Sequence, residues 1–448
     1  MPETQAIHPA GAANRYTYRI ASVAALGGLL FGFDTAIING AIVFLRRQFV
    51  WSDFETEIAA SSLLVGCVAG AGFAGALSDR YGRRRMLLAA AGIFALSSVA
   101  AALPNSLAEF AAARTIAGAA IGVASMLAPL YIAEVSPESI RGRLVSLNQL
   151  AIMLGILLSY VAGWLLAGLG DASWRWMFAS AAAPSLLFFA ALFTVPESPR
   201  WLVAVNREAD ARGILSRLNQ PASRVDTIRE AIAEEKDVNL RDRSLRKPLL
   251  IGVALAILQQ VTGINTILYY GSIIFTEQAG ALSASSALWA NVIIGVVNLL
   301  CTVIALAVID RIGRKALLMF ASAGMGVSLT LLGVLLSMPG MASGLILTLV
   351  LCYVGCFSVG LGPGVWVVIS ELFPTRVRGR AMSVATISLW MACLAITSSF
   401  LSVVRAISIV GAFGTYAALC LLTFLFVWRC VPETKGRSLE EIERQWTK

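Results

Sequence analysis

The chain has 448 residues, of which 58% are hydrophobic and 14% are charged, and its formal net charge is +9. Its mean hydropathy of +0.78 lies far outside the range of water-soluble domains, so the composition predicts a polytopic membrane protein. His8 is the only histidine, which argues against a zinc site and against a serine-histidine hydrolase.

The first predicted helix follows a polar N-terminal stretch without a signal-peptide pattern, and its apolar run is too long for a cleaved signal. Apolar runs of roughly 18 to 28 residues then recur, each long enough to cross a hydrocarbon core of about 30 Å as an α-helix. The result is an all-α membrane protein. Its twelve predicted transmembrane helices are residues 18–45, 57–77, 86–103, 108–133, 144–168, 176–195, 249–276, 286–309, 316–337, 343–370, 381–404 and 409–430.

The first span contains the stretch GGLLFGFDTAIING, in which Asp34 lies about 15 Å from one end of the helix. Arg114, in the span 108–133, lies about 9 to 12 Å from the same side. An unpaired charge at this depth would cost several kcal/mol, so the two side chains are expected to pair. Burial opposes ionisation of the carboxyl and the guanidinium favours it, so protonation can depend on whether a cavity is open. Such a pair suits a proton-coupled carrier; the alternative is a structural ion pair in a uniporter.

Basic residues crowd into alternate loops, and the remaining loops carry only Arg46, Arg47, Arg175 and Arg405. The positive-inside rule therefore predicts a multi-pass protein of the plasma (inner) membrane with both termini in the cytoplasm. The net positive charge then faces anionic lipid, and nucleic-acid binding is not needed to explain it.

The chain also repeats itself. IAEVSPESIRGRLVS (132–146) matches ISELFPTRVRGRAMS (369–383), LSDRYGRRR (77–85) matches VIDRIGRK (308–315), and PESPRWL (196–202) matches PETKGRSL (432–439). The offset of about 231 to 237 residues predicts two pseudo-symmetric six-helix halves with a site between them near the midplane. The predicted organisation is an N-terminal half (1–199), a linker (200–247), a C-terminal half (248–431) and a cytoplasmic tail (432–448).

The repeated loop motifs place carboxylates near helix ends, where they face arginines of neighbouring loops. They are Asp79, Glu134, Asp310 and Glu371. Taken singly, each is equally well explained as solvated surface charge. Their repetition favours an ionic latch between the halves.

The linker changes abruptly to charged composition, yet READARGILSRL and RVDTIREAIAEEKDV carry apolar residues at helical spacing. This pattern predicts short amphipathic helices on the cytoplasmic face. A flexible linker, the alternative, would have fewer apolar residues and more Pro, Gly and Ser.

Amide side chains gather in the span 249–276, at Gln259, Gln260 and Asn265, with Gly263 between them able to loosen the helix. Amides both donate and accept hydrogen bonds, which suits a polar ligand, and Trp366 offers a flat apolar surface. The alternative for each amide is a helix-packing hydrogen bond.

Eight motifs in order, between about residues 17 and 440, resemble the sugar porter branch of the major facilitator superfamily, close to bacterial xylose-proton symporters and glucose facilitators. They are GGLLFGFDTAIING, GALSDRYGRRR, YIAEVSPESIRGRLVSLNQL, PESPRWL, QQVTGINTILYY, VIDRIGRK, GPGVWVVISELFPTRVRGR and VPETKGRSLEE. The resemblance implies a monomeric alternating-access transporter that imports a monosaccharide, a pentose or hexose such as xylose or glucose, by proton symport. No cofactor or enzymatic activity is expected.

The resemblance also implies roles for individual residues. Substrate-binding positions are Phe31, Gln149, Gln259, Gln260, Asn265, Asn298, Gly362, Trp366 and Trp390. The outer gate corresponds to Tyr269 and Tyr270, and proton coupling to Asp34 and Arg114. The cytoplasmic charge network corresponds to Arg84, Glu134, Arg141, Arg314, Glu371 and Arg378.

Two departures from the family pattern bear on function. Ala181 stands where related xylose symporters have a second carboxylate, and Leu389 stands where sugar porters commonly have Asn or Gln before Trp390. Because Ala181 lacks the second carboxylate, a proton-independent uniporter stays an alternative. Leu389 predicts a sugar specificity that differs from that of glucose facilitators. There are three further alternatives: a polyol or inositol-proton symporter, a nutrient sensor and a drug-proton antiporter. The short tail argues against the sensor, and the motifs PESPRWL and QQVTGIN argue against the antiporter.

Overall fold

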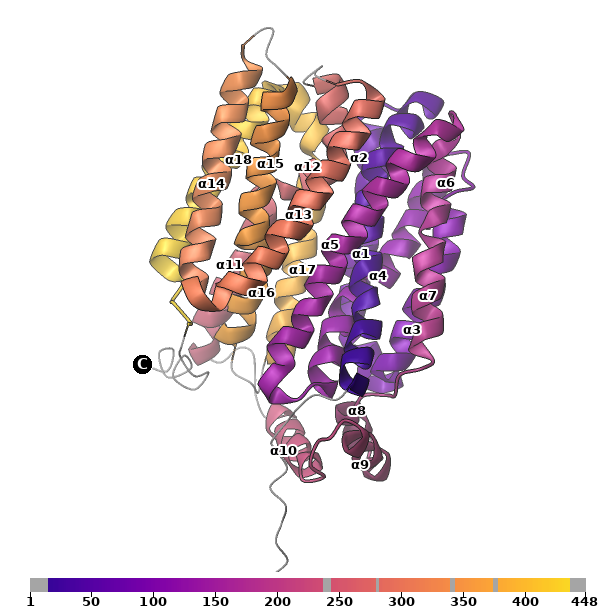
Figure 1. Ribbon diagram of the computed structural model, residues 1–448, viewed down its shortest axis with the longest axis vertical. Helices are drawn as coiled ribbons and strands as arrows, with labels where there is room; N and C mark the ends of the chain where they lie inside the picture. The colour runs from indigo at the N-terminus through magenta and orange to yellow at the C-terminus, as the bar shows by residue number, and fades with distance from the viewer. Residues whose placement is uncertain (1–14, 237–242, 279–281, 339–342, 374–377, 436–448) are drawn as a thin grey trace, which may run out of the picture.

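The computed structural model describes residues 15–236, 243–278, 282–338, 343–373 and 378–435 (Figure 1). These residues form helices joined by short connections. The N-terminal half contains α1 (Arg15–Phe49), α2 (Asp53–Tyr81), α3 (Arg83–Ala100), α4 (Leu107–Val135), α5 (Arg141–Leu166), α6 (Ser173–Ser180) and α7 (Ala182–Leu192). The linker contains α8 (Pro199–Ala204), α9 (Glu208–Arg217) and α10 (Arg224–Lys236). The C-terminal half contains α11 (Arg243–Val261), α12 (Ile264–Ile273), the π-helical turn η3 (Ile274–Gln278), α13 (Ala284–Ile312), α14 (Arg314–Leu336), α15 (Ser343–Val359), α16 (Leu361–Leu372), α17 (Arg378–Thr397) and α18 (Phe400–Cys430).

Every predicted span coincides with a helix or with consecutive helices. Among the described residues, 11 spans are long and apolar enough to cross a membrane. The remaining predicted span corresponds to α3, which has 18 residues and begins with three arginines, so its N-terminal turn is strongly polar. The chain is thus an all-α, multi-pass membrane protein with twelve spans.

Two of the predicted spans are broken near their middle. The span 249–276 is interrupted between α11 and α12 at Gly263, whose φ of 92° is left-handed and whose Cβ would lie 2.7 Å from the ring of Tyr416. The span 343–370 is interrupted between α15 and α16 at Gly360, where a Cβ would lie 2.3 Å from the carbonyl oxygen of Leu317. Glycine is required at both breaks, and each exposes backbone groups at membrane depth.

The predicted span 381–404 runs past the end of its helix, whereas 409–430 matches the part of α18 that follows Ser408. Helix α17 ends at Thr397 and α18 begins at Phe400, while Ser408, with a φ of 66°, divides residues 400–407 from the rest of α18. The error has a physical reason. The apolar run continues through the turn, so hydropathy does not mark the turn at Ser398 and Ser399.

The two halves use the same packing scheme. In the N-terminal half, α1 packs on α5, α2 on α4 and α3 on α7; in the C-terminal half, α11 packs on α17, α13 on α15 and α14 on α18. Figure 1 shows the halves side by side, the first coloured indigo to magenta and the second orange to yellow. They meet where α5 packs against α13, α2 against α17 and α1 against α12. This is the two-half arrangement predicted from the sequence repeat.

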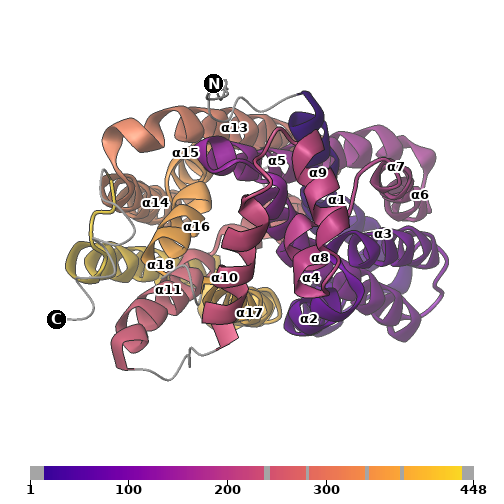
Figure 2. The same cartoon turned by 90° about the horizontal axis from the view of Figure 1, so that it is seen from below.

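The linker helices lie below one end of the bundle (Figures 1 and 2), which we call the linker end; the opposite end is the far end. They bury their own apolar cluster around Trp201, Leu215 and Val225. Gln220 donates a hydrogen bond of 3.0 Å to the carbonyl of Val135 at the end of α4. The described linker helices α8 to α10 therefore pack on one another and contact the N-terminal half, as predicted for amphipathic helices.

Candidate functional site

The site contains a buried ion pair between α1 and α4. The Arg114 guanidinium donates a hydrogen bond of 2.6 Å to Asp34, and each residue is 1% exposed. The guanidinium also lies 5.1 Å from the ring centroid of Phe178 on α6. The expectation from helix depth that these charges meet is confirmed. Ala181, three residues after Phe178, is buried at the break between α6 and α7.

One oxygen of this pair is left without a partner. Asp34 Oδ2 is buried and makes no hydrogen bond with the described residues, and the same holds for the neighbouring Thr35 hydroxyl. A buried carboxylate oxygen of this kind is costly unless something satisfies it. This oxygen therefore keeps an unused lone pair that can accept a proton or a hydrogen bond.

Amides of α11 and α12 form a chain that crosses the C-terminal half. Gln259 donates hydrogen bonds to the carbonyls of Leu361 (2.7 Å) and Gly362 (3.0 Å), next to the break before α16. Gln260 donates one of 3.1 Å to Gln259 Oε1. Asn265 donates to Gln260 Oε1.

The series of hydrogen-bonded amides continues from Asn265 to Cys393 on α17. Asn265 Nδ2 lies 3.1 Å from the sulfur of Cys393, so it ties α12 to that helix. A straight helix would separate Gln260 and Asn265 by about one and a half turns. The left-handed Gly263 between α11 and α12 brings the two amides together. These bonds are of the helix-packing kind, and sugar binding by the same amides stays a prediction.

The other predicted binding residues occupy several helices around the interface. Phe31 on α1 and Trp390 on α17 make an edge contact with ring centroids 5.1 Å apart, so aromatic rings of the two halves touch. Trp390 Nε1 is buried and has no hydrogen-bond partner in the described part of the chain. Leu389 is buried, at 6% exposure.

The remaining predicted positions differ in their bonding. Gln149 on α5 and Trp366 on α16 are half-buried. Asn298 on α13 accepts a hydrogen bond of 2.7 Å from the Ser358 hydroxyl on α15, which is a helix-packing contact. The substrate-binding role of Asn298 stays a prediction, as do those of the half-buried Gln149 and Trp366.

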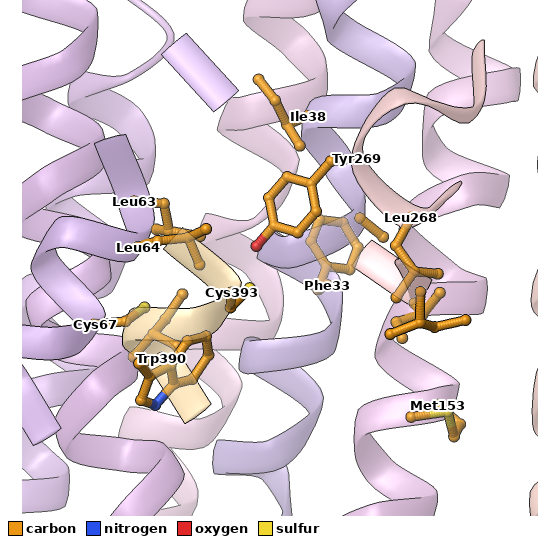
Figure 3. Close-up of a cluster of buried hydrophobic side chains, with 14 of the residues drawn as sticks. Phe33, Ile38, Leu63, Leu64, Cys67, Met153, Leu268, Tyr269, Trp390 and Cys393 are labelled. Carbon is orange, nitrogen blue, oxygen red and sulfur yellow. The ribbon is translucent and has the colours of Figure 1, made fainter. Parts of the chain in front are cut away.

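Both gate tyrosines are fully buried between the halves. Tyr270 donates a hydrogen bond of 2.7 Å to the Thr397 carbonyl, and its ring lies 5.3 Å from that of Phe400. The Tyr269 hydroxyl has no hydrogen-bond partner among the described residues. Figure 3 shows that it points toward the side on which Cys67 and Cys393 lie.

The sequence analysis missed an amide contact between the halves. Asn39 on α1 accepts a hydrogen bond of 2.7 Å from the backbone N–H of Ser272 on α12. Asn291 on α13 donates a bond of 2.9 Å to the Ser272 hydroxyl. Asn39 is the third polar residue in the stretch that holds Asp34, after Thr35, and this polarity within an apolar run was the available signal.

Charged contacts at the far end were also missed. Glu57 on α2 is 1% exposed and accepts hydrogen bonds of 2.7 Å from both the backbone N–H and the hydroxyl of Ser402 on α18. Asp53 pairs with Arg405 and with Arg46, each at 2.5 Å. Arg46 pairs in turn with Glu277 at 2.8 Å. The sequence analysis named Arg46 and Arg405 only as loop charges and did not single out Glu57, Asp53 or Glu277.

At the linker end, one residue of the expected charge network needs correction. Arg83, and not Arg84, pairs with Glu134, at 3.2 Å. Arg84 instead donates a hydrogen bond of 2.9 Å to the Leu192 carbonyl. Arg83 is the repeat equivalent of Arg314, because each follows the glycine of its motif.

At the linker end, Glu134 and Glu371 are bonded in the same way, each to an arginine and to a hydroxyl group. Glu134 accepts a hydrogen bond of 2.5 Å from Ser198, and Glu371 accepts one of 2.5 Å from Thr434 while pairing with Arg314 at 3.0 Å. Each of these bonds stays within one half. The expected latch between the halves therefore does not describe these pairs. Arg141 begins α5, and the side chain of Arg378 lies outside the described residues.

Comparison with known proteins decides the family. The family model described as "Sugar (and other) transporter" matches residues 20–446. The chain belongs to this sugar transporter family.

Relatives and solved structures match nearly the whole transporter. It is 39% identical to the arabinose-proton symporter of Bacillus subtilis (strain 168), over 96% of this chain and 95% of the relative. It is 38% identical to the D-xylose-proton symporter of Escherichia coli (strain K12), over 96% of each chain. The partially occluded inward open conformation of the xylose transporter XylE from E. coli matches with a TM-score of 0.84 at 35% identity, covering 95% of this chain and 100% of that one.

The contacts between the halves agree with this structural match. Asn39 and Glu57 of the N-terminal half bind Ser272 and Ser402 of the C-terminal half, all toward the far end. Toward the linker end, the charged clusters of Glu134 and Glu371 join elements of a single half. The far end thus carries amide and carboxylate hydrogen bonds between the described residues of the two halves.

Proposed function

We propose that this chain imports a monosaccharide together with a proton by alternating access. The observation that carries the proposal is the buried pair of Asp34 and Arg114, in which one carboxylate oxygen is unpartnered. Desolvated charges of this kind are rare in membrane helices and are usually functional. The proton-symport relatives named above support the same assignment.

The proposed substrate is a pentose or hexose, with xylose, arabinose and glucose as the first candidates. The sugar would exchange hydrogen bonds with the amide chain of Gln259, Gln260 and Asn265, with Gln149 and Trp390 supplying further polar groups. Trp366 would stack on its C–H face. Leu389 can neither donate nor accept, so a sugar with fewer hydroxyls on that side is favoured.

The proposed orientation places the linker end in the cytoplasm, with both termini on that side, in the plasma or inner membrane. The positive-inside rule supports it, because the basic linker and the motif loops share this end. The protein is proposed to act as a monomer in the lipid bilayer.

The decisive experiment measures uptake in proteoliposomes. Purified protein is reconstituted, an inward proton gradient is imposed, and accumulation is measured for radiolabelled pentoses, hexoses and polyols. Accumulation above equilibrium, with alkalinisation of the outer medium when sugar is added, supports symport. Equilibration without accumulation would instead identify the uniporter, and transport of a polyol alone would identify the polyol alternative.

A further inference from the structure

The connection between α17 and α18 is contacted by α12 of its own half and by α2 of the opposite half. It runs from Thr397 to Ile407 and includes the short helical segment 400–407, which Ser408 separates from the rest of α18. The Tyr270 hydroxyl bonds the Thr397 carbonyl and its ring packs on Phe400, so the gate helix α12 rests on this segment.

The N-terminus of this segment lacks a cap from its own residues. Ser399 occupies the cap position but makes no capping hydrogen bond, and its hydroxyl bonds the Ala395 carbonyl instead at 2.7 Å. Free N–H groups in the first turn of a helix require acceptors, and a carboxylate is favourable there because of the helix dipole. Glu57 of α2 supplies this acceptor to Ser402.

A second carboxylate binds the same segment one helical turn away. Asp53 precedes Glu57 by four residues on α2, and it pairs with Arg405. The Asp53 side chain is 17% exposed and that of Arg405 is 70% exposed, so solvent weakens this pair. The Glu57 carboxylate is buried, at 1% exposure, and its two hydrogen bonds to Ser402 are part-buried, so solvent weakens them less than the Asp53–Arg405 pair.

We propose that Glu57, Asp53, Ser402 and Arg405 form a far-end latch whose strength sets how long the transporter stays closed at the far end. Alternating access requires the halves to separate there once per cycle, and these bonds must then break. Glu57 is the principal positioning residue, because its carboxylate accepts a first-turn N–H of a helix in the other half. The inference rests on the alternating-access part of the proposed function and is independent of the sugar and of proton coupling.

Hydrogen–deuterium exchange of the purified full-length protein in lipid nanodiscs, without sugar and at fixed pH, tests the latch. Glu57→Ala is expected to shift the equilibrium toward the far-end-open state by about tenfold. Deuterium uptake should rise in peptides covering 267–278 and 397–407. It should fall at the linker ends of α4 and α17, because these ends approach one another when the far end opens.

Glu55, on the same helix as Glu57, provides the control variant. Glu55→Gln removes a carboxylate of the same helix whose bonds remain local to Ser52, and it should leave both regions unchanged. Glu57→Gln keeps the side-chain shape and replaces Glu57→Ala if that variant does not fold. A rise at the far end without the fall at the linker end would mean local fraying and would overturn the proposal, as would unchanged uptake at both ends.

Discussion

Asp34→Asn is the perturbation that tests the transport mechanism most directly. The amide oxygen can still accept the hydrogen bond from Arg114 that now measures 2.6 Å, but it cannot carry a proton between the two sides. An inward gradient of two pH units stores about 2.7 kcal/mol per proton. With one proton per sugar, the unmodified protein can accumulate sugar up to about 100-fold. The variant should stop at equal concentrations inside and outside.

The same substitution leaves the buried Arg114 charge without its counter-charge, and breaking a buried pair costs about 3 to 5 kcal/mol. A thermal unfolding scan must therefore accompany the transport assay. Counterflow exchange of labelled sugar should persist in Asp34→Asn, since it requires no net proton movement. Glu109→Gln, in the exposed first turn of the same helix as Arg114, should behave like the unmodified protein. Undiminished uphill accumulation by Asp34→Asn would refute the coupling role.

Three further predictions concern single residues. Gln260→Ala removes the centre of the amide chain and should raise the sugar dissociation constant about tenfold, or about 1.4 kcal/mol, by calorimetric titration; an unchanged constant would leave Gln260 with a packing role only. Leu389→Asn should improve binding of a hexose more than that of a pentose, and an unchanged ratio of the two dissociation constants would show that Leu389 only packs. Arg83→Gln should lower the thermal unfolding midpoint more than Arg84→Gln, because only Arg83 pairs with Glu134; equal shifts would argue against this pairing.

Some features were accessible from the sequence because they depend on local pattern. Hydropathy locates the spans, the repeat gives the two halves, and helix geometry places Asp34 and Arg114 at matching depth before any contact is known. The left-handed break at Gly263 was also anticipated, since glycine beside polar residues in an apolar helix is a plausible point of unwinding.

Other features depend on how the halves dock and left little trace in the sequence. Glu57 and Ser402 are 345 residues apart, and Asn39 and Ser272 are 233 apart, so no periodicity connects them. Arg83 and Arg84 are one residue apart on a helix, so their side chains point in directions that differ by about 100°. Arg83 therefore reaches the Glu134 carboxylate, whereas Arg84 reaches the backbone carbonyl of Leu192. Alignment of the two repeats would have resolved this choice, since Arg83 and Arg314 occupy the same motif position.

The distribution of charged contacts also bears on how the transporter moves. At the linker end, Arg83 with Glu134 and Arg314 with Glu371 each hold one half together. At the far end, Glu57 and Asp53 bind residues of the other half. Rigid-body rocking preserves bonds within a half and breaks bonds between halves. The linker-end pairs therefore stabilise each half, and substitutions there should lower thermal stability. The far-end contacts bias the equilibrium toward the state that is closed at the far end, and substitutions there should shift that equilibrium.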